Sequence, residues 1–515
     1  MLRAIANVWS TSHMIVAYIL IFIINFVQAM QQGMSFSLTP YLTSSFSLDS
    51  LTATTSIMSS LIGGIFKLPL AKILDIWGRP QGFALMVLCM LRGLIMMAGC
   101  QNVQTYAAAQ VFYWVGYNGM SYTLGIFVAD TSSLKNRGFM FAFISSPYIA
   151  IVWITGPMAK AFLAVDGPGW RWGYGTFTIV VFAVTFPLYA LFMWNYRKAK
   201  NMGLIVNHKS NRTFLELVKY YTIEFDLAGI FLLAIGLALF LLPFSLYSYQ
   251  GDGWKSSMII CMLVFGVVFL IVFALYEKFI APKTFIPFDL LVDRTVMGAC
   301  VLAAVLFVSF LQVVNGLSIT KATYALVTEV SIRWTGRFKW LALYFGVPVT
   351  ILGVALMANF RQPDVHIGYV VMCQIFIAFS GGTLVICEQM AVMAAASHQH
   401  LAVVLAVEAM FSSIGGAIGS TVAAAVWRGV FPKRLQRYLP EESKADWATI
   451  YRSITAQLSY PKGTATRHAI ERAYGDVQKY MIAGGSSVLV LAIISVVVWR
   501  DIKVKDFKQA KGRVV

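Results

Sequence analysis

The sequence predicts an all-α polytopic membrane protein, and three observations lead to this fold class. Of the 515 residues, 59% are hydrophobic and only 12% are charged, so lipid rather than water is the expected solvent for most of the chain. The apolar residues are collected in runs of about 20, the length that crosses a bilayer as a helix. The net charge of +18 is concentrated in short turns between these runs. That distribution is typical of membrane orientation and not of nucleic-acid binding.

The apolar runs predict about thirteen spans of helical length. They are expected near residues 14–36, 51–74, 82–100, 105–129, 138–164, 174–196, 226–248, 257–276, 295–314, 340–359, 368–394, 402–427 and 480–499. A fourteenth crossing is needed near 315–332, where the segment is too short and too polar for an ordinary span. Either this truncated span crosses in a distorted form buried against protein, or the later half is inverted, or a helix has been lost from the gene model.

Basic residues in the short turns predict the orientation. Lys and Arg gather at Asp75–Arg79, Lys135–Arg137, Arg197–Lys219, Lys278–Arg294 and Arg333–Lys339, and in the tail 500–515. These segments are expected in the cytoplasm, which places both termini there. The longest outer loop is predicted at 430–479. Its helix-like stretches and its aromatic residues Trp447, Tyr451 and Tyr460 indicate either surface helices or an aromatic lid over an outer vestibule.

A polar turn occurs twice and suggests two related halves. The first copy contains Asp75, Gly78 and Arg79, and the second contains Arg333, Gly336 and Arg337. Each pairs a glycine that permits a tight turn with an arginine at the start of an apolar run. We expect these six residues to form a conformational latch on the cytoplasmic side.

The first turn resembles a motif of the major facilitator superfamily, which has a small residue, then Asp, then Gly-Arg. Ala71, Asp75 and Gly78-Arg79 stand at these positions, and Asp130 followed by Arg137-Gly138 is similar to a second marker. Gly156-Pro157 resembles the Gly-Pro motif of proton-coupled antiporters, although Val152 and Lys160 replace its glycines. The resemblance implies two six-helix halves that rock around a central cavity.

Longer segments resemble the fungal siderophore–iron transporters of that superfamily. They are Trp77–Phe83, Leu191–Leu204, Thr335–Gly346, Gly381–Met393 and Ala406–Ser420. The resemblance implies fourteen spans, with an inserted helix pair between the halves. The expected domains are a first half at 1–196, a cytoplasmic linker at 197–225, the inserted pair and its loop at 226–294, a second half at 295–499 and a basic cytoplasmic tail at 500–515.

Acidic residues within spans are candidates for proton coupling. Glu388 is expected near the membrane midplane and Glu408 in the inner half of its span, and Asp130 closes the fourth span. Charged groups in a membrane are costly, and burial disfavours the charged form of a carboxyl group, so these acids are suited to taking up protons. The alternative is a protonated or hydrogen-bonded glutamate that only packs. Lys67 is expected to reach the surface along its flexible side chain.

Polar and aromatic residues in spans one, four and five are candidates for a substrate cavity. The predicted set is Gln28, Gln32, Tyr113, Tyr117, Asn118, Tyr122, Tyr148 and Trp153. Rings supply contact area and amides supply orientation, which suits a bulky ferric hydroxamate complex. Because such iron arrives already chelated, and because the six cysteines lie in apolar runs without histidine neighbours, no metal site and no cofactor are predicted.

The resulting hypothesis is a secondary transporter that imports ferric siderophores with protons. The expected partners are the siderophore complex, protons and the lipid bilayer of the plasma membrane or an endosomal vesicle, with the chain as a monomer and no nucleic acid. One alternative is a related fourteen-span proton antiporter for drugs or glutathione. Another is a transport-deficient sensor or a truncated remnant, which the short segment at 315–332 favours. No enzyme is predicted, because no nucleophile–base set, phosphate loop or metal spacing occurs in any polar segment.

Overall fold

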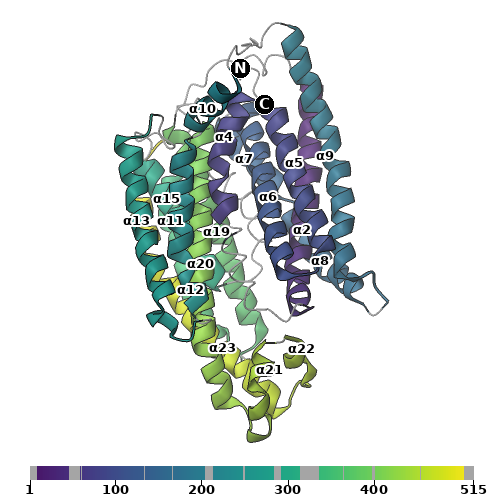
Figure 1. Ribbon diagram of the computed structural model, residues 1–515, viewed down its shortest axis with the longest axis vertical. Coiled ribbons are helices and arrows are strands. Elements are labelled where there is room, and N and C mark those ends of the chain that lie inside the picture. Colours follow the sequence, from purple (N-terminus) through teal and green to yellow (C-terminus); the bar gives the residue numbers. More distant parts are fainter. Residues whose placement is uncertain are drawn as a thin grey trace.

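The computed structural model is built of helices that run nearly parallel to one another (Figure 1). It describes residues 9–45, 58, 61–132, 134–164, 166–202, 213–224, 226–247, 250–282, 292–313, 336–362, 365–396, 401–452 and 454–503. The N and C ends lie at the same end of the bundle, which we call the terminal end. The short helices α21 (Trp447–Arg452) and α22 (Ile454–Ser459) lie at the opposite end, which we call the loop end.

The first half of the chain forms one group of helices. Its members are α2 (Thr11–Ser45), α4 (Lys67–Ile76), α5 (Arg79–Gly99), α6 (Val103–Thr131), α7 (Leu134–Ser145), α8 (Tyr148–Leu163) and α9 (Gly169–Asn201). Within the group, α5 packs against α6 and α9, and α2 packs against α8 and α9. Helix α4 lies at the boundary with the second half, where it contacts α20.

The inserted pair follows a short helix α10 (Phe214–Glu224). It consists of α11 (Leu227–Leu241), continued by α12 (Pro243–Leu246), a short turn η2 (Gly253–Lys255), and α13 (Ser257–Phe279). Helices α11 and α13 pack on each other, and α11 and α12 contact α20 of the second half. Helix α13 exposes a wide apolar face, with Val264, Phe265 and Ile271 each more than half exposed. Such a face is stable in lipid and would be unfavourable in water.

The second half forms the other group (Figure 1). It contains α15 (Arg294–Val313), α17 (Lys339–Leu341), the π-helical turn η3 (Ala342–Gly346), α18 (Val347–Phe360), α19 (Ile367–Ala395), α20 (Leu401–Tyr438), η5 (Glu441–Asp446), α23 (Ala465–Val488) and α24 (Val490–Val497). Helix α15 lies among α19, α20, α23 and α24 and contacts each of them. Its side chains Ala299, Cys300 and Leu306 are fully buried there.

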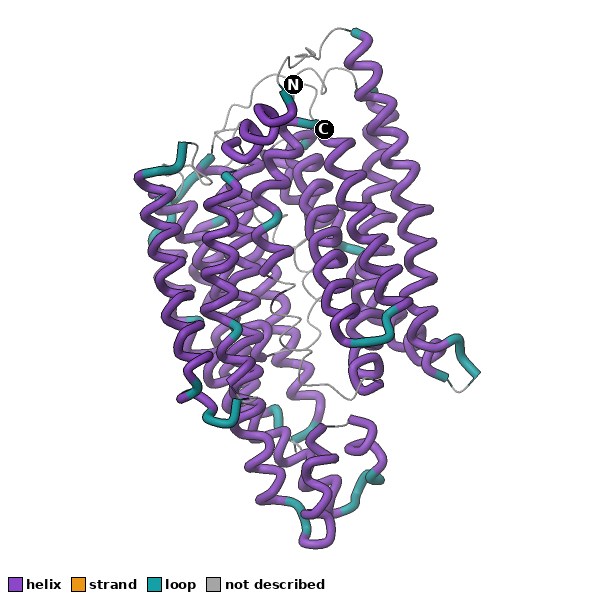
Figure 2. The backbone as a smooth tube through the Cα atoms, viewed as in Figure 1, coloured by secondary structure: helices purple, strands orange, loops and turns teal. Residues whose placement is uncertain are grey.

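The helices agree with the predicted spans in most places and differ in two. Within the described residues, eight helices are long and apolar enough to cross a membrane. The single span predicted at 138–164 is divided into α7 and α8, because Pro147 lacks an amide donor and begins the second helix. Helix α20 continues past the predicted end of its span at 427 to Tyr438 (Figure 2), while the helix-like stretches predicted in the loop at 430–479 are confirmed by α21, α22 and the start of α23 at Ala465. The truncated span at 315–332 lies outside the described residues.

Glycines allow close approach between helices of the same half. A Cβ atom added at Gly116 of α6 would lie 2.2 Å from the Met90 nitrogen of α5, and one added at Gly415 of α20 would lie 2.2 Å from the Ala304 oxygen of α15. Both contacts are with backbone, which cannot rotate away. Gly415 therefore permits the close contact of α20 with α15, and Gly116 has the same function in the first half.

Replacing Gly116 by Ala is expected to lower the thermal unfolding temperature of the purified protein. The added methyl group must push α5 away from α6, and overpacking of this kind costs about 1–3 kcal/mol. Gly429→Ala in α20 is the matched control, because a Cβ atom there meets no atom within 4 Å. Equal unfolding temperatures for the two variants would show that the α5–α6 contact is looser than described.

Candidate functional site

A polar seam runs between α2 and α6. The Tyr113 hydroxyl donates to Gln31 Oε1 at 2.6 Å, and the Tyr117 hydroxyl donates to Gln32 Oε1 at 2.9 Å. Positions 113 and 117 are one turn apart on α6, so they face the same side as the two adjacent glutamines of α2. The rings of Tyr113 and Tyr117 are also in contact, with centroids 5.8 Å apart. The structure thus brings together three of the predicted cavity residues and adds Gln31.

Gln28 lies one turn before Gln31 on α2. Its side chain is only 2% exposed, and neither its amide nitrogen nor its amide oxygen has a hydrogen-bond partner among the described residues. An unsatisfied buried amide is costly, by about 1–3 kcal/mol. In a membrane protein such a group is a strong candidate for contact with a polar ligand.

The other predicted cavity residues have different surroundings. The Asn118 amide donates to the Trp114 carbonyl at 3.0 Å, one turn earlier in α6. The Tyr122 hydroxyl donates to the Ala402 carbonyl at 2.5 Å and so joins α6 to α20 of the other half. The side chains of Tyr148 and Trp153 lie outside the described part of the molecule. Tyr122 therefore belongs to the boundary between the halves and not to the α2–α6 seam.

Glu388 and Glu408 lie at the same depth. Glu388 is seven residues before the end of α19, and Glu408 is seven residues after the start of α20. At 1.5 Å per residue both lie about 10 Å from the terminal ends of their helices. Their side chains interact, and both are nearly or fully buried, with relative exposures of 0% and 5%. The two predicted acids therefore form one site, although they were expected at different depths.

Lys67 approaches this acidic site from the first half of the chain. It is the first residue of α4, and its charge interacts with that of Glu408. Next to it, a Cβ atom added at Gly64 would lie 2.2 Å from the Cβ atom of Ser413 in α20. The expectation that Lys67 reaches the membrane surface is therefore wrong, because its charge is buried near an acid of the opposite half.

The first Gly-Arg turn is held by an ion pair within the first half. Gly78 adopts a φ of +109°, a conformation that glycine tolerates best, and Arg79 then begins α5. The Arg79 guanidinium lies 3.0 Å from Asp130 at the end of α6. Arg137 also interacts with Asp130, donates to the Ser132 carbonyl at 3.2 Å and contacts the Met393 sulfur across the boundary between the halves. The side chain of Asp75 lies outside the described part.

The second Gly-Arg turn has the same backbone and different partners. Gly336 has a φ of +72°, and Arg337 lies 3.4 Å from Asp501, which follows the last helix. Lys339 donates to the Val497 and Trp499 carbonyls at 2.8 and 2.5 Å. A cation at the carbonyl end of a helix is favourable, so this turn caps α24. Arg333 lies outside the described residues.

At the loop end, a small hydrophobic cluster forms between the extensions of α20 and α23. Its buried members are Phe431, Leu435, Leu439, Ile450, Ala469, Ile470, Ala473, Val477 and Met481. The predicted lid residues Trp447, Tyr451 and Tyr460 are partly buried against this cluster. Their rings thus stabilise a compact loop-end subdomain, formed by residues 431–481. A covering function over substrate stays a prediction.

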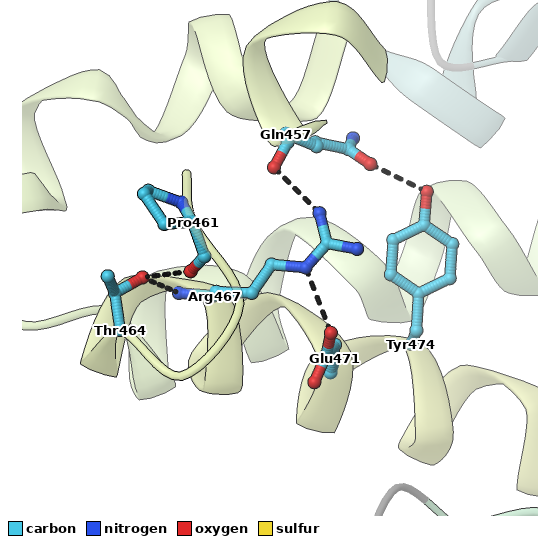
Figure 3. Close-up of polar contacts among 6 residues, drawn as sticks. All are labelled: Gln457, Pro461, Thr464, Arg467, Glu471 and Tyr474. Carbon is cyan, nitrogen blue, oxygen red and sulfur yellow. Dashed lines mark hydrogen bonds and ion pairs between the residues drawn. The ribbon is translucent and has the colours of Figure 1, made fainter. Parts of the chain in front are cut away.

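Polar contacts fix the same subdomain (Figure 3). Arg467 forms an ion pair with Glu471 at 2.9 Å and donates to the Gln457 carbonyl at 2.9 Å. The Tyr474 hydroxyl donates to Gln457 Oε1 at 2.8 Å. The Thr464 hydroxyl accepts a hydrogen bond from the backbone amide of Arg467 and so caps the N-terminus of α23. Within the subdomain, side chains of α23 are therefore bound to α22.

Sequence reasoning missed two residues of the boundary between the halves. Arg137 was recognised only as a motif position, and Lys67 was assigned to the surface. Arg137 is 1% exposed and contacts both halves. For Lys67 the available signal was a positive charge within an apolar run, which requires an explanation, whereas Arg137 stands in a predicted basic turn. The identity of the partner was not available, because a single sequence does not pair distant residues.

Three comparisons are consistent with this architecture. Residues 21–420 match the family model of the Major Facilitator Superfamily. The human organic anion transporter MFSD10 superposes with a TM-score of 0.53 over 93% of this chain and 98% of its own, at 13% identity. The proton:xylose symporter XylE superposes with a TM-score of 0.51 over 94% of this chain and 97% of its own, at 11% identity. At these identities the two superpositions show the fold alone.

Two curated relatives match the chain over its whole length. The MFS siderochrome iron transporter 1 of Ajellomyces capsulatus is 63% identical over 536 aligned positions, which cover 100% of this chain and 91% of the relative. The siderophore iron transporter mirB of Emericella nidulans is 40% identical and covers 100% of this chain and 88% of its own length. The first alignment has 536 positions, 21 more than the 515 residues of this chain. The chain therefore belongs to the fungal siderophore–iron transporter family of the major facilitator superfamily.

Proposed function

We propose that the protein imports ferric siderophore complexes, of the hydroxamate type, by proton symport with alternating access. The observation that carries this proposal is the 63% identity over the full chain to a protein named as a siderochrome iron transporter. The substrate cavity includes the α2–α6 seam, where Gln28, Gln32 and Tyr117 supply amides and a ring. Such groups suit a neutral or weakly charged complex rich in oxygen atoms.

Contacts between the halves support a rocking mechanism. Helices α4, α6 and α7 contact α19 and α20 close to the terminal end, and the two groups of helices diverge toward the loop end (Figure 2). If the terminal end faces the cytoplasm, as the basic turns indicate, this conformation is closed to the cytoplasm. Import then requires the contacts at the terminal end to separate and those at the loop end to form.

The charged turns act as latches that keep each half rigid during rocking. Arg79 and Asp130 join α5 to α6. Arg337 and Asp501 join the segment before α17 to the segment after α24. Asp130, held 3.0 Å from a guanidinium, is better suited to this ion pair than to proton transfer. Proton coupling is therefore assigned to Glu388 and Glu408, which share one buried site.

Uptake of radiolabelled iron tests the proposed direction. Cells that lack other siderophore transporters should accumulate iron supplied as a ferric hydroxamate when they express this chain. Loss of preloaded substrate without uptake would favour the drug or glutathione antiporter. Binding of the complex without flux would favour the transport-deficient sensor, for which the 21 additional positions in the alignment with the Ajellomyces relative are the specific observation.

Replacing Gln28 by Leu is expected to weaken ferric siderophore binding about tenfold or more while leaving the unliganded protein equally or more stable. The leucine removes an unsatisfied buried amide, whose cost is about 1–3 kcal/mol, and also removes its bond to the ligand. Binding by the purified protein and its unfolding temperature would be measured together. Gln110→Leu in α6 is the matched control, because the Gln110 amide nitrogen already donates to the Tyr106 hydroxyl at 2.7 Å. Loss of stability without loss of affinity in Gln28→Leu would remove Gln28 from the binding site.

A further inference from the structure

A groove lies along the exposed side of α9, near the terminal end of the bundle. Its volume is about 910 Å³, at the upper end of the range of about 300–1,000 Å³ that is usual for small-molecule sites. Among the described residues its walls come from α9, at positions three or four apart that share one side of the helix. They include Phe186, Tyr189, Met193, Trp194, Arg197 and Lys198.

The groove changes from apolar to basic along its length. The side chains of Phe186 and Trp194 are 55% and 68% exposed, so the rest of the described protein leaves both rings largely uncovered. Arg197 and Lys198 follow toward the terminal end and are also exposed. Within the described part of the chain, no acidic side chain forms an ion pair with either of these cations. The groove therefore combines ring surface at one end with two positive charges at the other.

Contacts on the opposite side of α9 give the depth of the groove. The Phe192 ring packs on the ring of Phe83, four residues after the start of α5, with centroids 5.7 Å apart. A Cβ atom added at Gly78 would lie 3.5 Å from the Tyr196 ring, so Tyr196 is level with the turn that precedes α5. The two cations of the groove come directly after Tyr196. They lie where α5 begins, and the end of α9 extends beyond them past the terminal end of α5 (Figure 1).

The groove has the dimensions of one membrane leaflet. Phe186 lies eleven residues before Arg197, about 16 Å deeper along the helix, and half of the hydrocarbon core is about 15 Å thick. Phe186 is therefore at the depth of the acyl chains, Trp194 is near the interface, where indole rings gather, and the cations are at the depth of the headgroups. Under the orientation proposed above this is the cytoplasmic leaflet, which carries the anionic phospholipids.

We propose that the α9 groove binds one anionic phospholipid. The phosphate of the lipid contacts Arg197 and Lys198, while its glycerol region and an acyl chain lie against Trp194 and the rings below it. Guanidinium and ammonium groups both form strong charge-assisted hydrogen bonds with phosphate oxygens. Basic residues at the end of a span can also serve orientation alone. Lys200 is such a residue, because it is exposed at the same end of α9 and does not line the groove.

The site is tested by titrating the purified protein in detergent with phosphatidylserine and measuring the first bound lipid by native mass spectrometry. Phosphatidylserine should bind more tightly than phosphatidylcholine. Arg197→Gln and Lys198→Gln should each weaken phosphatidylserine binding about fivefold, the contribution of one basic residue at an anionic surface. Lys198→Arg should keep the affinity, because it keeps the charge. Lys200→Gln is the matched control and should bind phosphatidylserine as the unaltered protein does.

The apolar part of the groove is tested by Trp194→Ala, which should also weaken phosphatidylserine binding. Trp172→Ala is its control, because the Trp172 ring is 59% exposed at the other end of α9 and should leave the affinity unchanged. Inorganic phosphate alone should not displace the lipid, since it cannot occupy the apolar part. Because all the substituted side chains are exposed, the variants should unfold at the same temperature as the unaltered protein when no lipid is added.

Equal affinities for phosphatidylserine and phosphatidylcholine would overturn the lipid site. A loss of affinity in Lys200→Gln as large as that in Lys198→Gln would also overturn it, because the effect would then come from the charge of the helix end and not from the groove. Displacement of phosphatidylserine by inorganic phosphate would assign the two cations to a free anion instead. The titration requires neither siderophore nor flux, so failure of the lipid site leaves the proposed import of ferric siderophores untouched.

Discussion

Replacing Glu388 by Gln should make ferric siderophore uptake independent of external pH. Glutamine keeps the shape and hydrogen-bonding groups of the side chain but cannot carry a proton. In the unaltered protein, each transported proton adds about 1.4 kcal/mol of driving force per pH unit, which corresponds to about a tenfold change in accumulation. The variant is expected to exchange siderophore across the membrane without concentrating it.

The measurement is uptake of radiolabelled iron over a series of external pH values, normalised to the amount of protein in the membrane. Glu442→Gln in η5 is the matched control, since this acid is exposed at the loop end and should leave the pH profile unchanged. If Glu388→Gln keeps the original pH profile, the proton is carried elsewhere, and Glu388 is a buried packing residue.

Replacing Asp130 by Asn is expected to destabilise the protein by about 3–5 kcal/mol, because it leaves the partly buried Arg79 and the buried Arg137 without their shared counter-charge. The Arg79 and Asp130 side chains are 10% and 17% exposed. The equivalent change in the second turn, Asp501→Asn, breaks a pair whose side chains are 44% and 49% exposed. Exposed pairs contribute about 0–1 kcal/mol, so this variant should resemble the unaltered protein.

Thermal unfolding of the two variants in detergent compares the two turns directly. The unfolding temperature is expected to fall strongly in Asp130→Asn and only slightly in Asp501→Asn. Similar losses in both would mean that the second turn also has a buried function. A second substitution, Arg79→Gln, should raise the unfolding temperature of Asp130→Asn again. Such a recovery would confirm that the unpaired charge, and not the loss of shape, causes the instability.

Much of the fold was predictable because membrane helices are defined by local properties. The runs at 82–100 and 368–394 predict α5 and α19 to within a few residues. The break at Pro147 was missed because proline is ambiguous in such helices. Pro157 and Pro187 lie inside α8 and α9, whereas Pro147 lies between α7 and α8 and precedes the first residue of α8. Neighbouring helices decide between these outcomes by satisfying or not satisfying the freed carbonyl groups, and that information is not local.

The sequence was sufficient to propose individual residues of the candidate site, but not to predict which of them contact one another. Gln32 and Tyr117 were named from their chemistry, and the structure places them 2.9 Å apart. The repeat of Gly78-Arg79 at Gly336-Arg337 was also visible, and the positive φ of both glycines agrees with it. The partners Asp130, Asp501 and Glu408 were not predictable, because they depend on which helices become neighbours. A single sequence constrains such long-range contacts only weakly.

The extension of α20 has a mechanical consequence. From the predicted end of its span at residue 427 the helix continues without interruption to Tyr438, a distance of about 16 Å at 1.5 Å per residue. Together with α23 it acts as a stiff lever arm, to which the loop-end subdomain is fixed. Any tilt of the second half is therefore transmitted to this subdomain and enlarged by the length of the arm. A spectroscopic label on α21 would follow the proposed rocking motion far from the residues proposed to bind substrate and protons.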